Sequence, residues 1–361
     1  MSVLGVLGRG DGAGSGPEVE AASQGWCRAR HVGLVSGGGG VLGRTDRTEV
    51  VLSRRGWMLF ALMSVLWGIP YLMIKVAVES VSVPMVVFTR TALGALVLLP
   101  LVIRSGQLDT VRRHWRPLLA FTAVEILGPW ALLSDAENRL TSSMTGLLIA
   151  AVPIVGVVLA WLTGDAERLG PMRWLGLLVG LAGVGVLAAP HLTGGSAWAI
   201  GEVMLVVLGY SIAPIITMRK LQDLPSLHMA AFALAIAALF YTGPAIATWP
   251  DAMPSGRVLA ALIALGLVCT ALAFIVFFEL IREVGTSRGM VFTYVNPAVA
   301  VAAGVVFLGE PLTGTIIASF ALILGGSVLA TARRATPPVA EPATEEVPSD
   351  GARTAAEPAS G

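Results

Sequence analysis

The feature that most constrains this chain is a stretch that occurs twice. Residues 142–189 and 286–331 each run through a polar start, an apolar run, a proline, a second apolar run, a loop with a glutamate, and an apolar run dotted with glycines. The two prolines, Pro153 and Pro297, are 144 positions apart. Repeated apolar segments interrupted by proline are the sequence signature of secondary transporters built from internal repeats. The sequence therefore predicts a duplicated membrane protein.

Composition supports this prediction. Of the 361 residues, 55% are hydrophobic and only 13% are charged, which is more apolar surface than a soluble domain can bury. The net charge of +1 gives no reason to expect a nucleic acid partner. The two cysteines, Cys27 and Cys269, are far apart, and no histidine or cysteine spacing is typical of a metal site. We therefore expect a lipid bilayer and a small-molecule substrate as partners, and no metal or cofactor.

From Trp57 onward, ten apolar segments each approach the ~20 residues that cross a bilayer core of ~30 Å. They are 57–77, 84–103, 118–136, 143–163, 172–190, 198–218, 227–247, 257–281, 287–308 and 313–332. At this length only helices satisfy their own backbone in lipid. We expect an all-α polytopic membrane protein of ten transmembrane helices, arranged as two five-helix repeats over 54–190 and 191–335.

The two ends of the chain differ from this core. Residues 1–53 are rich in glycine and arginine without helical or strand period, and we expect them to be disordered. An alternative is that the native protein starts near Val50 or Met58 and that the preceding residues are a misread start. Residues 336–361 are rich in Pro, Ala, Glu and Thr and are expected to form a disordered cytoplasmic tail.

Ten helices bring both termini to one side of the membrane, and basic residues decide which side that is. The side of the termini carries Arg44, Arg47, Arg54, Arg55, Arg104, Arg112, Arg113, Arg116, Arg168, Arg173, Arg219, Lys220, Arg282, Arg288, Arg333 and Arg334, and the opposite side carries Arg139 and Arg257. This asymmetry predicts a multi-pass protein of the plasma membrane with both termini cytoplasmic. Because five is an odd number, the second repeat is expected to be inverted relative to the first.

Four charged residues lie within apolar segments: Lys75, Arg90, Glu125 and Glu202. A charge at the bilayer centre costs ~2.5–3.5 kcal/mol on insertion scales, so such side chains usually face a cavity or a partner. Glu125 ranks first because it precedes Pro129, which lacks an N–H and leaves the Glu125 carbonyl without its helical donor. A carboxylate beside a free carbonyl can hold an ammonium group or a proton. A structural ion pair with Arg90 or Lys75 is the open alternative.

The other three charges also have two interpretations each. Arg90 lies within the second segment and could grip a substrate carboxylate through its guanidinium fork, or simply neutralise Glu125. Lys75 closes the first segment and could snorkel to the interface. Glu202 lies near the start of the sixth segment, close to the outer face, and is a weaker candidate.

Prolines and aromatic residues complete the predicted site. The prolines expected to kink helices and to expose backbone carbonyls are Pro70, Pro129, Pro153, Pro214 and Pro297. Polar or aromatic residues near them are expected to line a cavity; those we single out are Trp67, Tyr71, Trp130, Tyr210, Tyr294 and Asn296. Glycines at 176, 180, 183, 325 and 326 let helices approach closely, either inside the protein or at the face of a homodimer.

Several short motifs resemble a known family. The chain reads Trp-Gly-Ile-Pro-Tyr at 67–71, followed by Lys75, and places Arg90 in the middle of the second segment. The loops at 164–169 and 309–312 carry repeated Gly-Asp-Ala-Glu-Arg-Leu and Gly-Glu-Pro-Leu elements. Together these resemble the EamA branch of the drug/metabolite transporter superfamily over about residues 56–332.

This resemblance implies export or exchange of amino acids or other small metabolites, but it does not fix the substrate. The first copy departs from the second by one extra residue between its proline and its glutamate. The sequence contains no nucleotide-binding motif, so we expect alternating access driven by substrate or proton gradients. A polyspecific drug efflux pump is the alternative. A membrane enzyme or sensor is disfavoured because no clustered catalytic set is present, and we expect the protein not to be an enzyme.

Overall fold

The computed structural model describes residues 53–164, 170–192, 195–285 and 290–331. All of them belong to one compact unit, which spans Leu52–Gly361. The two terminal segments expected to be disordered lie outside the described residues, apart from Ser53.

Every regular element among the described residues is helical. In the first half these are α1 Arg54–Gly68, α2 Pro70–Val78, α3 Val83–Ile103, α4 Leu108–Arg113, α5 Trp115–Thr122, η1 Ala123–Leu127, α6 Gly128–Ala136, α7 Ser142–Ile149, α8 Val152–Leu162, α9 Pro171–Ala188 and η2 Ala189–His191. In the second half they are α10 Gly195–Lys220, α11 Ser226–Ala247, α12 Gly256–Ile263, η3 Ala264–Leu272, α13 Ala273–Val284, η4 Met290–Tyr294, α15 Asn296–Leu308 and α16 Gly314–Thr331.

By length and composition, nine helical segments within the described residues can cross a membrane. Nine of the ten expected segments match them within a few residues, so the protein is an all-helical, multi-pass membrane protein. The ten-helix count is not confirmed. The expected segment at 287–308 becomes a short 3₁₀ turn, η4, and the 13-residue helix α15, which is shorter than the other spans.

Proline starts several of the helical pieces. Pro70, Pro153 and Pro297 lie in the first turns of α2, α8 and α15, where the missing N–H costs no hydrogen bond. The first, fourth and ninth expected segments are therefore each broken into two pieces. Pro214 differs, because α10 runs through it without interruption.

Two π-helical stretches, η1 and η3, interrupt the third and eighth expected segments. They are repeat-related, since adding 144 to the bounds of η1 gives 267–271, which lies inside Ala264–Leu272. A π-turn adds a residue to the helix, widens it and re-aims side chains, and such bulges are frequent at functional sites. Neither stretch was expected from the sequence.

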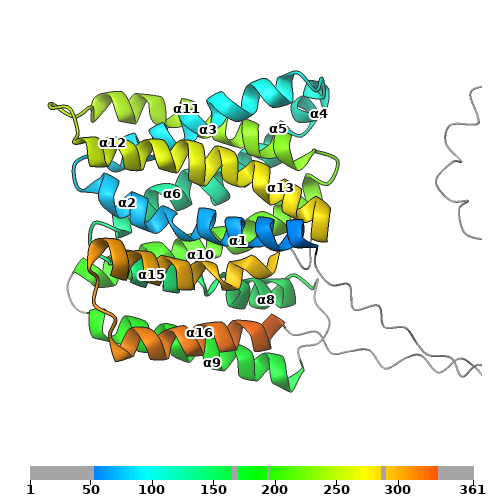
Figure 1. Cartoon of the computed structure of the whole chain (residues 1–361). Helices are drawn as coiled ribbons and strands as arrows, with labels where there is room; N and C mark the ends of the chain where they lie inside the picture. The colour runs from blue at the N-terminus through cyan, green and yellow to red at the C-terminus, as the bar shows by residue number, and fades with distance from the viewer. Residues whose placement is uncertain (1–52, 165–169, 193–194, 286–289, 332–361) are drawn as a thin grey trace, which may run out of the picture. The chain divides into compact units, whose positions relative to one another are not determined.

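The helices pack with an internal two-fold pattern (Figure 1). α3 packs on its repeat counterpart α11, and α9 packs on its counterpart α16. α7, from the fourth expected segment, packs on α15, from the ninth. The remaining two main contacts exchange counterparts, since α1 packs on α13 and α10 packs on α6. Each of these five interfaces joins one half of the chain to the other, which is compatible with a two-fold relation between the halves.

Glycine makes the α9–α16 contact very close. A Cβ added at Gly326 would lie 2.3 Å from the backbone nitrogen of Gly180 and 2.7 Å from the carbonyl oxygen of Gly176. Gly183 likewise faces the backbone of Ile323 at 2.8 Å. These glycines pack inside the protein, as the first of the two alternatives predicted.

The predicted orientation can be tested directly with cysteines. In a background without the native cysteines, Leu192→Cys is expected to react in intact cells with a membrane-impermeant thiol reagent, and Arg112→Cys is expected to react only after lysis. Both side chains are exposed. In the predicted topology Arg112 lies in a cytoplasmic loop after the second span, and Leu192 lies in a loop after the fifth span on the opposite side of the membrane. The opposite labelling pattern would reverse the orientation.

Candidate functional site

Arg90 lies at the centre of the candidate site. The side chain projects from α3 and is only 8% exposed. Its Nε donates to the hydroxyl of Thr270 at 3.0 Å, and its Cζ lies 3.6 Å from the ring centroid of Trp130. Thr270 in turn donates to the carbonyl oxygen of Leu265 at 2.7 Å, within η3. The second half of the chain thus positions an arginine of the first half, and the Trp130 face stabilises its charge.

Arg90 has no anionic partner in the part of the chain that the structure describes. No carboxylate there lies within the 4.0 Å that defines an ion pair with its guanidinium, and the possible partner Glu125 forms no ion pair with Arg90 or Lys75. Leaving a charge buried without a counter-charge is costly. The structural ion pair with Glu125 that the sequence left open is therefore not formed among the described residues.

Two tyrosines link Arg90 to the buried acids. Tyr71 of α2 interacts electrostatically with Arg90 and with Glu137, and Tyr210 of α10 interacts with both Arg90 and Glu125. Glu125 lies in η1 and is half-buried. Tyr71, Arg90, Glu125, Trp130 and Tyr210, predicted separately from sequence, therefore form one constellation, which we call the Arg90 cluster.

The π-helical stretch places Glu125 against α10. A Cβ added at Gly209 would lie 2.4 Å from the carbonyl oxygen of Val124, so the two helices approach closely beside Tyr210. At the end of η1, Gly128 donates to the carbonyl oxygen of Ala123, and the Tyr241 hydroxyl donates to that of Leu127 at 2.7 Å. Pro129 follows in the first turn of α6. The bulge is thus held by side chains and backbone from both halves.

Lys75 is half-buried, and its ammonium group bonds to backbone carbonyls. Its Nζ donates to the carbonyl oxygens of Glu137, at 2.5 Å, and Leu140, at 2.8 Å, just beyond the end of α6. A cation at a helix C-terminus is favourable because it satisfies carbonyls that lack helical donors. Lys75 therefore ties α2 to the end of α6.

Glu137 is a further buried acid near the site, and it was not predicted from the sequence. This residue is fully buried, and neither oxygen of its carboxyl group has a hydrogen-bond partner. It interacts electrostatically with Lys75, Glu310 and Arg90. It directly follows the apolar segment 118–136, where a charged residue is ordinary, so the sequence carries no signal that it is buried.

The structure also gives Glu310 a role that was not predicted. Its carboxylate accepts hydrogen bonds from the backbone nitrogens of Ser142, at 2.7 Å, and Ser143, at 2.9 Å, and from the Ser143 hydroxyl. We call these contacts the Glu310 latch. An anion at a helix N-terminus satisfies free N–H groups and the helix dipole. The latch joins the loop after α15 to the start of α7.

The serine and the glutamate of the latch each belong to a motif that occurs twice in the sequence. Glycines make room for it, since a Cβ at Gly304 would lie 2.3 Å from the Glu310 carboxylate, and Gly309 adopts a left-handed φ of 66°. The repetition of serine and glutamate was visible in the sequence, but their contact across the halves was not. The counterparts Glu167 and Ser287 lie outside the described residues.

Ion pairs connect helices at both ends of the bundle. At one end, Glu202 of α10 accepts from the Trp198 indole at 2.8 Å and lies 3.6 Å from Arg139, which pairs with Asp135 at 2.7 Å. Glu202 thus belongs to this network near the end of α6.

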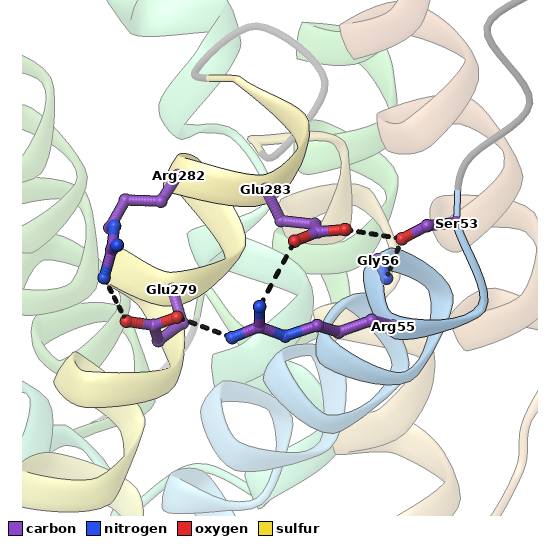
Figure 2. Close-up of polar contacts among 6 residues, drawn as sticks. All are labelled: Ser53, Arg55, Gly56, Glu279, Arg282 and Glu283. Atoms are coloured by element: carbon purple, nitrogen blue, oxygen red, sulfur yellow. Dashed lines mark hydrogen bonds and ion pairs between the residues drawn. The ribbon is translucent and has the colours of Figure 1, made fainter.

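At the other end, Figure 2 shows Arg55 of α1 between two acids of α13, Glu279 at 2.8 Å and Glu283 at 3.5 Å. The Ser53 hydroxyl also donates to Glu283 at 2.6 Å. Positions 279 and 283 lie 144 after 135 and 139, so the two networks are repeat-related. The charges are partly exposed and each pair adds little stability.

Three predicted lining residues lie in a different environment. Trp67 packs in an aromatic cluster with Phe277 at 5.2 Å and Phe292 at 5.4 Å between ring centroids. The Tyr294 hydroxyl bonds to that of Thr331 at 2.6 Å. Asn296 lies against the backbone carbonyls of Ser64 and Phe292, at 3.2 and 3.1 Å from its amide nitrogen.

The helix break in the fourth segment offers little free backbone. Ser211 of α10 donates to the carbonyl oxygen of Val152, and Ser327 of α16 donates to that of Ala150, both at 3.2 Å. The break between α7 and α8 is therefore joined to α10 and α16 by side-chain hydrogen bonds.

Comparisons with known proteins agree with this architecture. The model of the EamA-like transporter family matches residues 54–189 and again residues 197–332. An uncharacterized inner membrane transporter of Escherichia coli K12, YedA, is 27% identical over 297 residues, which is 80% of this chain and 96% of that protein. The uncharacterized transporter YvbV of Bacillus subtilis is 23% identical over 273 residues, 74% of this chain and 88% of that one.

A solved crystal structure has the same fold. It superposes with a TM-score of 0.57 at 21% identity and covers 76% of this chain and 96% of its own. The two matches to the family model lie end to end, and together they span most of the chain and each of the helices that build the Arg90 cluster. The protein is a membrane transporter that belongs to the EamA-like transporter family.

Proposed function

We propose that this protein is a secondary transporter that exports or exchanges amino acids or related small metabolites by alternating access. The observation that carries the proposal is the buried Arg90 guanidinium, which is stacked on Trp130 and has no carboxylate within ion-pair distance among the described residues. Arginine binds carboxylates through two parallel hydrogen bonds, and only its Nε is used here by the protein.

The ammonium group of an amino acid substrate would also have a partner in the Arg90 cluster. Glu125 and Arg90 both interact electrostatically with Tyr210, so the two opposite charges lie near the same phenol. A zwitterion would place its carboxylate on Arg90 and its ammonium group on Glu125. The site would then be neutral when occupied, which lowers the cost of burying both charges.

Alternating access follows from the proposed repeat organisation. With repeats over 54–190 and 191–335 in opposite orientation, the same contacts can form at either end of the bundle. The repeat-related networks around Arg139 and Arg55 support this proposal because they lie at the C-terminal ends of the equivalent helices α6 and α13, which inversion of one repeat would bring to opposite ends of the bundle. We place the protein in the plasma membrane with both termini in the cytoplasm.

A polyspecific drug efflux pump is the second candidate. The observation in its favour is the aromatic cluster of Trp67, Phe274, Phe277 and Phe292, whose ring centroids lie 5.2 to 6.1 Å apart. Such rings can stack on flat or cationic drugs. An efflux pump of this kind would not need the unpaired Arg90.

Flux into proteoliposomes separates the two candidates. Purified protein is reconstituted and tested with labelled amino acids, with organic acids that lack an amino group, and with lipophilic cations. Saturable amino-acid flux is expected, together with altered amino-acid sensitivity of cells in which the protein is deleted or overproduced. Flux of lipophilic cations alone would favour the drug pump, and no flux of any class would remove the proposal.

Glu125→Gln tests the ammonium partner. Transport of amino acids is expected to fall about tenfold, because one charge-assisted hydrogen bond contributes ~1.5–3 kcal/mol. Organic acids without an amino group should keep their flux. Glu79→Gln is the matched control, since Glu79 is an exposed acid at the end of α2. Equal flux of both substrate classes in Glu125→Gln would remove Glu125 from the site.

A further inference from the structure

Glu137 is the most unusual buried group that the proposed substrate site does not use. It follows the last residue of α6 and is 0% exposed. Both of its carboxyl oxygens lack a hydrogen-bond partner. The nearby Glu310 carboxylate, by contrast, accepts three hydrogen bonds through the latch. An ionised carboxylate without donors is very costly to bury, whereas a neutral carboxyl is not.

The charged neighbours of Glu137 come from three parts of the bundle. α2 contributes Lys75 and the phenol of Tyr71, α3 contributes Arg90, and the loop before α16 contributes Glu310. Lys75 could neutralise the carboxyl group, but its Nζ donates to the backbone carbonyls of Glu137 and Leu140. The carboxyl group is therefore close to a cation that does not bond to it.

Burial raises the pKa of Glu137 well above its usual range; Lys75 and Arg90 oppose the shift, and Glu310 adds to it. In an open, hydrated state the group would return toward the ordinary value of ~4.3. At a pH between the ordinary pKa of the open state and the raised pKa of the closed state, the closed state binds one more proton than the open state. Raising the pH through this window therefore favours opening, by up to about tenfold per pH unit for one proton.

We propose that Glu137 is a proton-binding site of the transport cycle, which holds a proton while the end of the bundle closed by the Glu310 latch is shut and releases it to water when that end opens. The inference rests on the proposed alternating access, but it concerns a residue outside the Arg90 cluster. When the latch opens, the separation of α7 from the loop before α16 admits water to Glu137. The freed carboxylate can then pair with the Lys75 ammonium.

The proposal makes the state of the latch depend on pH, which can be measured without a substrate. Thr145→Cys places a thiol one turn inside the latch, at a position that is fully buried. Met253→Cys places a second thiol in an exposed loop, where it reports the intrinsic effect of pH on thiol reactivity. Both are made in a background without Cys27 and Cys269, and the purified protein is labelled in nanodiscs, so that reagent and buffer reach both faces.

The ratio of the Thr145→Cys rate to the Met253→Cys rate is expected to rise with pH, by up to about tenfold per unit, above the ordinary carboxyl pKa of ~4.3. Glu137→Gln, a permanent mimic of the protonated acid, should give a low ratio at every pH. Glu137→Asp keeps a titrating group and should keep the slope, which separates titration from a merely structural role. A slope that persists in Glu137→Gln, or a flat ratio in the parent protein, would overturn the proposal.

Glu310→Gln provides the second comparison. It weakens the latch and is expected to raise the ratio at every pH while the slope from Glu137 remains. If Glu137→Gln does not yield folded protein, a slope retained in Glu137→Asp and lost in Glu137→Leu still supports the proposal, and loss of the slope in Glu137→Asp counts against it. Failed substrate flux with an intact pH slope would contradict the proposed function alone.

Discussion

Arg90→Gln is expected to lower transport of carboxylate substrates by about 100-fold or more. Two charge-assisted hydrogen bonds from the guanidinium fork to the substrate are lost, and each contributes ~1.5–3 kcal/mol. Protein stability should fall much less than transport, because the protein loses only the hydrogen bond to Thr270 and the stacking on Trp130, and no described carboxylate lies within ion-pair distance of Arg90. Flux into proteoliposomes and thermal unfolding in detergent measure the two effects.

Two controls make this result specific. Arg90→Lys keeps the charge but loses the fork and the stacking on Trp130, and it is expected to recover only a small part of the flux. Arg282→Gln removes an exposed arginine that pairs with Glu279, and it should leave flux and stability unchanged. If Arg90→Gln unfolds the protein instead, the arginine is a structural residue and the substrate proposal loses its main support.

The sequence predicted the helices well because hydropathy reports directly on what the bilayer requires. Nine segments agree with the described spans within a few residues. The interruptions were harder to predict. Pro70 and Pro214 both lack a backbone N–H. A new helix begins at Pro70, whereas α10 continues through Pro214, so the proline alone does not predict a break. The π-helical stretches carry no such mark at all.

The candidate site was predicted in part for a similar reason. A charge in an apolar segment, such as Arg90 or Glu125, is conspicuous in a sequence. Which charges meet is decided by long-range packing, and Arg90 turned out to face Thr270 and Trp130 instead of Glu125. Glu137 and Glu310 lie at segment ends, where a charge is ordinary, and only the three-dimensional structure shows that they are buried.

The repeat explains why many residues of the candidate site are positioned by contacts with the other half of the chain. Each of the five helix interfaces described above joins the two halves, so a residue of one copy is usually positioned by the other. Thr270 holds Arg90, and Glu310 holds Ser142, in the same way. Sequence comparison of the two copies reveals equivalent positions, but it does not reveal which non-equivalent positions touch.

Gly326→Ala is expected to destabilise the protein severely, at the upper end of the ~1–3 kcal/mol typical of overpacking or beyond it. The new Cβ would lie 2.3 Å from the backbone nitrogen and 2.4 Å from the Cα of Gly180, and 2.7 Å from the carbonyl oxygen of Gly176. Backbone atoms cannot rotate away as a side chain can, so α9 and α16 must separate. Thermal unfolding and the yield of monodisperse protein in detergent measure the loss.

Gly325→Ala is the matched control, because it is the adjacent residue of the same helix and a Cβ there meets no atom within 4 Å. Alanine also favours a helix over glycine by ~0.8–1.0 kcal/mol, so this variant should be as stable as the parent or slightly more so. The same helix propensity acts in Gly326→Ala, and only the contact with α9 distinguishes the two substitutions. Equal stability of the two variants would mean that α9 and α16 are not packed backbone to backbone in the membrane, and the internal-packing interpretation of these glycines would fall with it.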